Sequence, residues 1–183
     1  MKVREKIHIN IGEYYASSEP ATLYTTLGSC VAVCFFEKKA RIGGMNHILL
    51  PGTPDLKTYN DSARFGINAV ELLLNRIFSL GGKKQNLIAK IFGGAHLLPD
   101  FSIKDSPGKK NIEFVEGFLR TESIPIISRH TGGTFTRTIY FHTDTSEIYL
   151  KKIRSSFFET FSKEEEFLSK YPTQIIKPDT TIF

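Results

Sequence analysis

The stretch that decides the fold is residues 27–34, which read LGSCVAVC. Its first three residues separate two runs rich in β-branched and aromatic side chains, Thr22–Thr26 and Val31–Phe36, and each run is predicted to form a strand. A turn at this point would expose Cys30 at the end of a sheet and direct backbone N–H groups toward it, which suits a thiol nucleophile. A small, buried structural cysteine is the alternative interpretation, and Cys34, deeper in the strand, fits that alternative better.

His47 is the candidate base for this thiol. It follows the residues GGMN and precedes ILLP, so it lies in an apolar strand where its ring nitrogens need hydrogen-bond partners. The segment between Cys30 and His47 is long enough for two neighbouring strands joined by a turn at Lys38-Lys39-Ala40. An antiparallel pairing of these strands would bring the thiol and the imidazole within hydrogen-bond reach.

The remaining pattern predicts a mixed α/β domain rather than a doubly wound parallel sheet. Apolar residues at helical spacing predict a helix over Asn60–Leu80, capped by Asn60 or Asp61 and ended by Gly81. A second helix is predicted to begin at Asn111, acting as its N-cap, and to end before Pro125. The other predicted strands are Lys6–Ile11, Ile42–Leu50, Leu87–Phe92, Ile124–Ser128, Thr136–His142 and Glu147–Lys152.

Composition and charge narrow the class of protein. With 183 residues, 40% hydrophobic and 23% charged, the chain can form one domain, expected over residues 1–153, followed by a helical or extended tail over residues 154–183. No apolar run approaches the roughly 18 residues of a membrane helix. The two cysteines are too few for a disulfide framework, so we expect a cytoplasmic protein.

The net charge of +5 comes from lysines and arginines spread along the whole chain, which is typical of a solvated surface and argues against nucleic-acid binding. A metal site built from Cys30, Cys34 and His47 is an alternative use of these side chains. No fourth ligand lies at a convincing spacing, so we expect no metal and no cofactor.

The order and spacing of several motifs resemble the CheD family, the chemoreceptor glutamine deamidases of bacterial and archaeal chemotaxis. The resemblance covers roughly residues 7 to 153. Besides LGSCVAVC, the motifs that carry it are GGMNH at 43–47, LP at 50–51, FG at 65–66, FGGA at 92–95, NIEFV at 111–115, and GG at 132–133 with Arg137.

The resemblance implies an α/β sandwich with α/β/β/α layers, similar to the catalytic domains of certain deamidating toxins. It implies a protein-glutamine glutaminase that converts glutamine side chains of methyl-accepting chemotaxis receptors to glutamate and releases ammonia. Cys30 would be the nucleophile and His47 its acid–base partner, without metal or cofactor. It also implies, as an optional partner, a CheC-type phosphatase of the phosphorylated response regulator.

The third catalytic residue departs from the family pattern. The family places a threonine six positions before the cysteine, and this chain has Tyr24 there. A strand alternates its faces, so Thr26 shares the face of Tyr24 and Thr25 lies on the other. We therefore expect Thr26 to orient His47, with the Tyr24 hydroxyl as the alternative. The same departure supports a second hypothesis, a weakly active or inactive binding module for a chemotaxis phosphatase.

Overall fold

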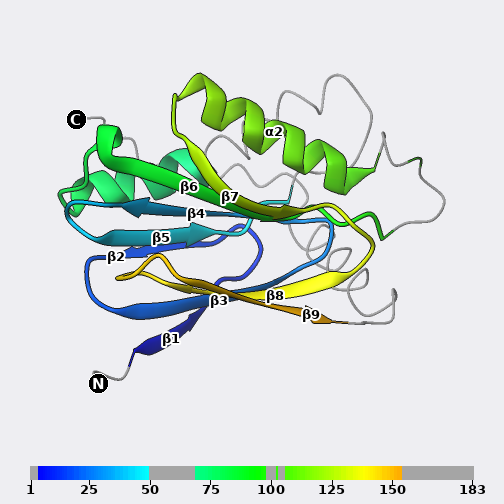
Figure 1. The fold of residues 1–183 in the computed structure, drawn as a ribbon, viewed down its shortest axis with the longest axis horizontal. Coiled ribbons are helices and arrows are strands. Elements are labelled where there is room, and N and C mark those ends of the chain that lie inside the picture. Colours follow the sequence, from blue (N-terminus) through cyan, green and yellow to red (C-terminus); the bar gives the residue numbers. More distant parts are fainter. Residues whose placement is uncertain (1–3, 50–68, 98–101, 103–105, 154–183) are drawn as a thin grey trace.

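A computed structural model describes residues 4–49, 69–97, 102 and 106–153. These residues form two β-sheets, two α-helices and a short 3₁₀ helix, η1 (Lys84–Asn86) (Figure 1). Sheet A has the strand order β1-β3-β8-β9, and sheet B has the order β2-β5-β4-β6-β7. Sheet A consists of β1 (Glu5–His8), β3 (Ala21–Leu27), β8 (Thr136–His142) and β9 (Ile148–Ile153). Sheet B consists of β2 (Tyr14–Ser17), β5 (Ile42–Asn46), β4 (Val31–Glu37), β6 (Leu87–Gly93) and β7 (Ile126–Thr131).

Both sheets are mixed. The β1–β3 and β6–β7 pairs are parallel, and every other named pair is antiparallel. The chain passes from sheet A to sheet B between β3 and β4, through residues 28–30. The glycine-containing turn identified in the sequence is therefore one of the points where the polypeptide crosses between the two sheets.

The core has two parts, one on each face of sheet B. Between the sheets, Leu23, Leu27 and Phe141 of sheet A share a buried cluster with Cys34 and Met45 of sheet B. The other face of sheet B is covered by both helices, α2 (Pro107–Thr121) and the helical residues 69–79. The layers of the described residues are therefore helices, sheet B and sheet A (Figure 1). A helical layer over the outer face of sheet A is not found among them.

The mixed α/β architecture is confirmed, and most predicted strands occur at or near their expected positions. The strand predicted over Ile42–Leu50 is shorter, because β5 ends at Asn46 and pairing continues only through an isolated bridge at Ile48. The short strand β2 was not predicted. The tail, residues 154–183, lies outside the described residues.

The first predicted helix is described only in its C-terminal part, and its proposed caps, Asn60 and Asp61, lie outside the described residues. Its end is as predicted. Gly81 has a left-handed φ of 97°, its N–H donates to Phe78 O at 2.9 Å, and the N–H of Gly82 donates to Ile77 O at 3.0 Å. These two bonds satisfy carbonyl groups that the helix end leaves unpaired.

The second helix begins earlier than predicted, so the assignment of Asn111 as its N-cap was wrong. Ser106 is the N-cap, its side chain accepts a hydrogen bond from Lys109 N at 3.3 Å, and Pro107 follows in the first turn. Proline suits this position because its missing N–H would have no partner there. Asn111 instead lies inside the helix and is fully buried.

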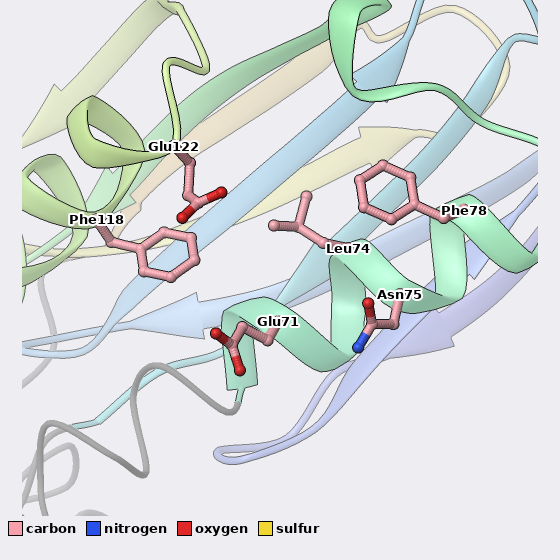
Figure 2. Close-up of a pocket in the computed structure, with 6 residues that line it drawn as sticks. All are labelled: Glu71, Leu74, Asn75, Phe78, Phe118 and Glu122. Atoms are coloured by element: carbon pink, nitrogen blue, oxygen red, sulfur yellow. The ribbon is translucent and has the colours of Figure 1, made fainter. Parts of the chain in front are cut away.

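A pocket lies between the two helices. Leu74, Phe78 and Phe118 form its apolar part, and Glu71, Asn75 and Glu122 also line it (Figure 2). Glu122 is already paired with Lys84 at 2.7 Å. Among the described residues, no helix is long and apolar enough to cross a membrane.

Candidate active site

Cys30 and His47 lie on the same face of sheet B. The bridge between Val31 and Ile48 has hydrogen bonds of 2.9 and 2.7 Å and continues the register in which Cys34 faces Met45. In that register Cys30 is a diagonal cross-strand neighbour of His47, and side chains in this relation are within reach of each other. The expected antiparallel neighbourhood of the two residues is therefore present.

This face is directed toward sheet A, so both side chains lie between the sheets. Cys30 is 1% exposed and His47 is 4% exposed. Cys30 belongs to the apolar cluster between the sheets, with Leu49 and Leu27. An imidazole in such a place requires a polar partner from the opposite sheet.

Thr25 of β3 is that partner. Its Oγ1 lies 2.8 Å from His47 Nδ1 and donates to the carbonyl oxygen of Ile9 at 2.7 Å. The threonine hydroxyl has one hydrogen, and the Ile9 carbonyl can only accept. The hydroxyl must therefore accept from His47, which makes Nδ1 the protonated nitrogen. A second contact, 3.4 Å from Nδ1 to the same Ile9 carbonyl, agrees with this tautomer.

The other ring nitrogen is left as a base. Nε2 of His47 is buried and has no hydrogen-bond partner among the described residues. With the proton on Nδ1, Nε2 carries a lone pair directed into the space between the sheets. A buried lone pair without a donor is costly, so Nε2 is the ring nitrogen that can accept a proton.

The structure does not bring Thr26 to His47. The hydroxyl of Thr26 instead contacts the hydroxyl of Thr138, at 2.9 Å on the outer face of sheet A. Leu23, Thr25 and Leu27 are buried, whereas Thr26 is exposed, so the inward face of β3 carries the odd-numbered positions. The expectation placed the correct type of residue on the wrong face of the strand.

Tyr24, the alternative, also faces outward. Its ring stacks on Tyr140 with centroids 5.8 Å apart and lies 4.9 Å from the ring of His8. Thr25 was missed because its position was counted from Cys30. The apolar residues at positions 23 and 27 are the signal that could have identified the inward face.

Burial lowers the pKa of His47 to about 4, and the hydrogen bond to the Ile9 carbonyl only partly opposes this. The imidazole is therefore neutral near pH 7, in the form that can accept a proton. Burial also raises the pKa of the Cys34 thiol, despite the nearby ammonium of Lys90. Cys34 is thus a neutral thiol near pH 7, which does not favour nucleophilic attack.

The turn that carries Cys30 is held from the side of sheet B. The N–H of Ala95 donates to Gly28 O at 2.8 Å, and the N–H of Gly94 donates to Cys30 O at 2.7 Å. Gly93 has a left-handed φ of 108°, and a β-carbon there would overlap the Cys30 carbonyl oxygen. The FGGA motif therefore serves as a close-packed support for the cysteine.

The loop after β7 joins the same end of the molecule. The N–H of Gly132 donates to Gly93 O at 2.9 Å, and the N–H of His96 donates to Gly133 O at 2.8 Å. The buried guanidinium of Arg137 donates to the carbonyls of His130 and Gly132. Among the described residues, no three His, Cys, Asp or Glu side chains gather as a metal site would require.

Comparison with known proteins identifies the family of this chain. The family model described as CheD chemotactic sensory transduction matches residues 49–152. A probable chemoreceptor glutamine deamidase CheD 1 of Shewanella oneidensis is 39% identical over 156 residues, covering 83% of this chain and 74% of that protein. The chain belongs to the CheD family.

Two further CheD relatives extend the comparison. A probable chemoreceptor glutamine deamidase CheD of Agrobacterium fabrum is 44% identical over 138 residues, 75% of this chain and 74% of that protein. Another, of Thiobacillus denitrificans, is 33% identical over 176 residues, 94% of this chain and 86% of that protein.

Proposed function

We propose that this protein is a cysteine-dependent protein-glutamine deamidase that acts on chemoreceptors in the cytoplasm. One observation carries the proposal. His47 is held through Nδ1 by Thr25, and its Nε2 has no hydrogen-bond partner among the described residues, on the same face of the sheet as Cys30. Membership of the CheD family, whose relatives are named as chemoreceptor glutamine deamidases, supports the choice of substrate.

The chemistry proceeds in two halves. Nε2 of His47 accepts the thiol proton while Cys30 Sγ bonds to the side-chain amide carbon, and the carbonyl electron pair moves onto oxygen. When the carbonyl re-forms, the C–N bond breaks, and His47 returns the proton to nitrogen so that ammonia leaves. Water, deprotonated by the same imidazole, then attacks the thioester. The products are a glutamate carboxyl group and the regenerated thiol.

Thr25 has an orienting role in this proposal. Its hydroxyl fixes the tautomer and rotation of His47 without giving up a proton of its own, because that proton is held by Ile9 O. This is the function that the third member of a cysteine–histidine site supplies. The hypothesis of an inactive binding module rested on Tyr24. Because Tyr24 lies on the outer face and Thr25 contacts the imidazole, that support is removed.

The test compares the two cysteines. Cys30→Ala should abolish ammonia release from purified chemoreceptor fragments, because it removes the bond-forming atom. Cys34→Ala is the matched control, since it removes a buried thiol from the same strand face, and it should retain most activity. Mass spectrometry of the fragments then identifies the glutamines that become glutamates. Near-normal activity of Cys30→Ala, or equal inactivation of both variants while folded, would refute the assignment.

A further inference from the structure

The side chain of Asn111 reaches the catalytic turn from the far side of sheet B. It is 0% exposed, lies inside α2, and its Nδ2 donates to the carbonyl oxygen of Ser29 at 2.9 Å. Residues 29 and 111 are far apart in sequence, so this bond is a specific tertiary contact. A buried amide in the middle of a helix that packs on apolar residues requires a reason, since Ile112, Val115 and Leu119 beside it belong to the core.

The carbonyl that Asn111 holds belongs to the peptide unit that joins Ser29 to Cys30. A trans peptide is planar, so its C=O and N–H point in opposite directions. The structure has no cis peptide bonds among its described residues. Fixing Ser29 O toward α2 therefore fixes the N–H of Cys30 away from α2.

Away from α2 is the side on which the thiol lies. Helix α2 packs on the face of sheet B that carries Val31 and Val33, whereas Cys30 belongs to the cluster between the two sheets. The N–H of Cys30 is thus directed toward the face that holds its own Sγ and His47. An N–H directed to that side can donate to the oxygen of a carbonyl whose carbon bonds to the sulfur.

The neighbouring peptide units are held in the same way. Gly28 O accepts from Ala95, and Cys30 O accepts from Gly94, so three successive carbonyls of the turn each accept a hydrogen bond from the loop after β6 or from α2. Two of these donors are backbone groups, which no substitution can simply remove. Asn111 is the only one of the three that is a side chain and can be tested directly.

We propose that Asn111 is a positioning residue that directs the Cys30 N–H toward the oxyanion formed during deamidation. This inference rests on the proposed function, and it adds a residue that acts through the backbone rather than by touching the substrate. A donor aimed in advance at a developing negative charge stabilises the transition state more than the ground state. Losing this orientation of the Cys30 N–H should therefore lower kcat and leave KM nearly unchanged.

Asn111→Leu removes the donor at similar volume. We expect kcat for ammonia release to fall by about 10- to 100-fold, less than or equal to the loss of a whole oxyanion donor. Alkylation of Cys30 by iodoacetamide should keep its wild-type rate, because displacement at a saturated carbon forms no oxyanion. Asn111→Ser is a second variant that adds no bulk, and its hydroxyl is too short to reach Ser29 O. It should show the same fall in kcat and the same alkylation rate.

Asn86→Leu is the matched control. Asn86 is also a buried asparagine whose Nδ2 donates to an oxygen, that of Glu37, but at the opposite end of β4 from Cys30. It should cost stability and leave kcat unchanged. A wild-type kcat in both Asn111 variants would overturn the inference. So would a parallel loss of alkylation and turnover in a folded protein, which would indicate general disruption of the turn.

A measurement independent of activity separates this inference from the proposed function. In ¹⁵N–¹H spectra, Asn111→Ser should shift the amide signal of Cys30, while Val31, whose N–H donates to Ile48 O, keeps its position. An unmoved Cys30 signal would overturn the role of Asn111 whatever the activity. If the wild type releases no ammonia from any receptor fragment, the proposed function fails, and the amide signal still decides whether Asn111 orients the peptide.

Discussion

The hydroxyl of Thr25 contacts Nδ1 of His47, and this hydroxyl can donate only one hydrogen bond. Because the Ile9 carbonyl takes that hydrogen at 2.7 Å, the imidazole must donate from Nδ1. Nε2 is then the basic nitrogen, and it is the one that has no partner among the described residues. The backbone at residue 9 therefore sets the protonation of a side chain far along the sequence.

Exchanging the threonine hydroxyl for a methyl group tests this directly. Thr25→Val keeps the shape but removes the acceptor, so His47 loses its fixed tautomer and rotation. We expect kcat to fall by about 10-fold or more, which is a smaller loss than removing proton-transfer catalysis entirely. Steady-state ammonia release measures the change.

Thr26→Val is the control from the same strand. It removes the hydroxyl that contacts Thr138 on the outer face, and turnover should stay near the wild-type value. The opposite result, with Thr26→Val harmful and Thr25→Val silent, would place the orienting group on the other face of β3 and contradict the tautomer argument.

At the scale of single residues, the motifs predicted that Cys30 and His47 would be neighbours, because a cysteine after a turn and a histidine in an apolar strand are visible along the chain. Thr25 was not predicted. Its selection depends on which face of β3 meets sheet B, and that depends on pairing between distant strands. The burial of Leu23 and Leu27 settles the question once the fold is known.

Among the elements, the loop after β6 has the strictest steric requirement. Gly93 combines a positive φ with a Cys30 carbonyl oxygen that lies where a β-carbon would be, so no other residue fits without moving the turn that carries Cys30. Gly94 is similarly close to Ile112 of α2. The end of β6, the start of α2 and the turn before β4 are therefore packed as one unit.

Gly93→Ala should lower both stability and turnover. The added methyl group overlaps a backbone oxygen that cannot rotate away, and the left-handed φ adds a cost of roughly 1 kcal/mol or more. Urea denaturation measures the stability, and ammonia release by the folded fraction measures the displacement of Cys30.

Gly117→Ala is the contrasting substitution. Gly117 lies inside α2, and a β-carbon there would meet nothing within 4 Å. Alanine should stabilise the protein by up to about 1 kcal/mol through helix propensity, with turnover unchanged. Equal effects of the two substitutions would show that the loop after β6 is not sterically restricted.

Helices and strands were predicted correctly where the local sequence pattern determines them. They were missed where contacts with distant parts of the chain determine them. β8 matches its predicted range, Thr136–His142, because strong β-formers fill it. β2 has only four residues, and its position at the edge of sheet B is set by pairing with β5. Asn111 was interpreted as a cap because asparagine favours that position, but here its amide is used for a tertiary hydrogen bond.

At the scale of the whole molecule, the crossing at residues 28–30 explains why this short stretch determines which side chains meet between the sheets. β3 and β4 are consecutive in sequence yet belong to different sheets, so the inward faces of both strands meet across the core. Thr25 lies just before the crossing and Cys30 at its end. The two-sheet arrangement is thus what brings Thr25, His47 and Cys30 together, and no local sequence pattern specifies it.

The burial of His47 between the sheets should also make the stability of the protein depend on pH. The folded-state pKa is about 4, below the unfolded value of 6.5. Between these values the unfolded chain binds a proton that the folded protein does not, so the free energy of unfolding decreases as pH falls from about 6.5 to about 4. A difference of this size corresponds to about 3 kcal/mol.

His47→Gln removes the titrating group and should flatten this part of the profile. Urea unfolding of both proteins at several values between pH 7 and pH 4 measures it, and the difference between the two curves isolates His47 from the other titrating residues. We expect the wild type to lose more stability than the variant over this range, and the gap to stop changing below pH 4. Parallel curves would mean that the imidazole gains a proton freely in the folded state, and Nε2 would then be accessible to water rather than held between the sheets.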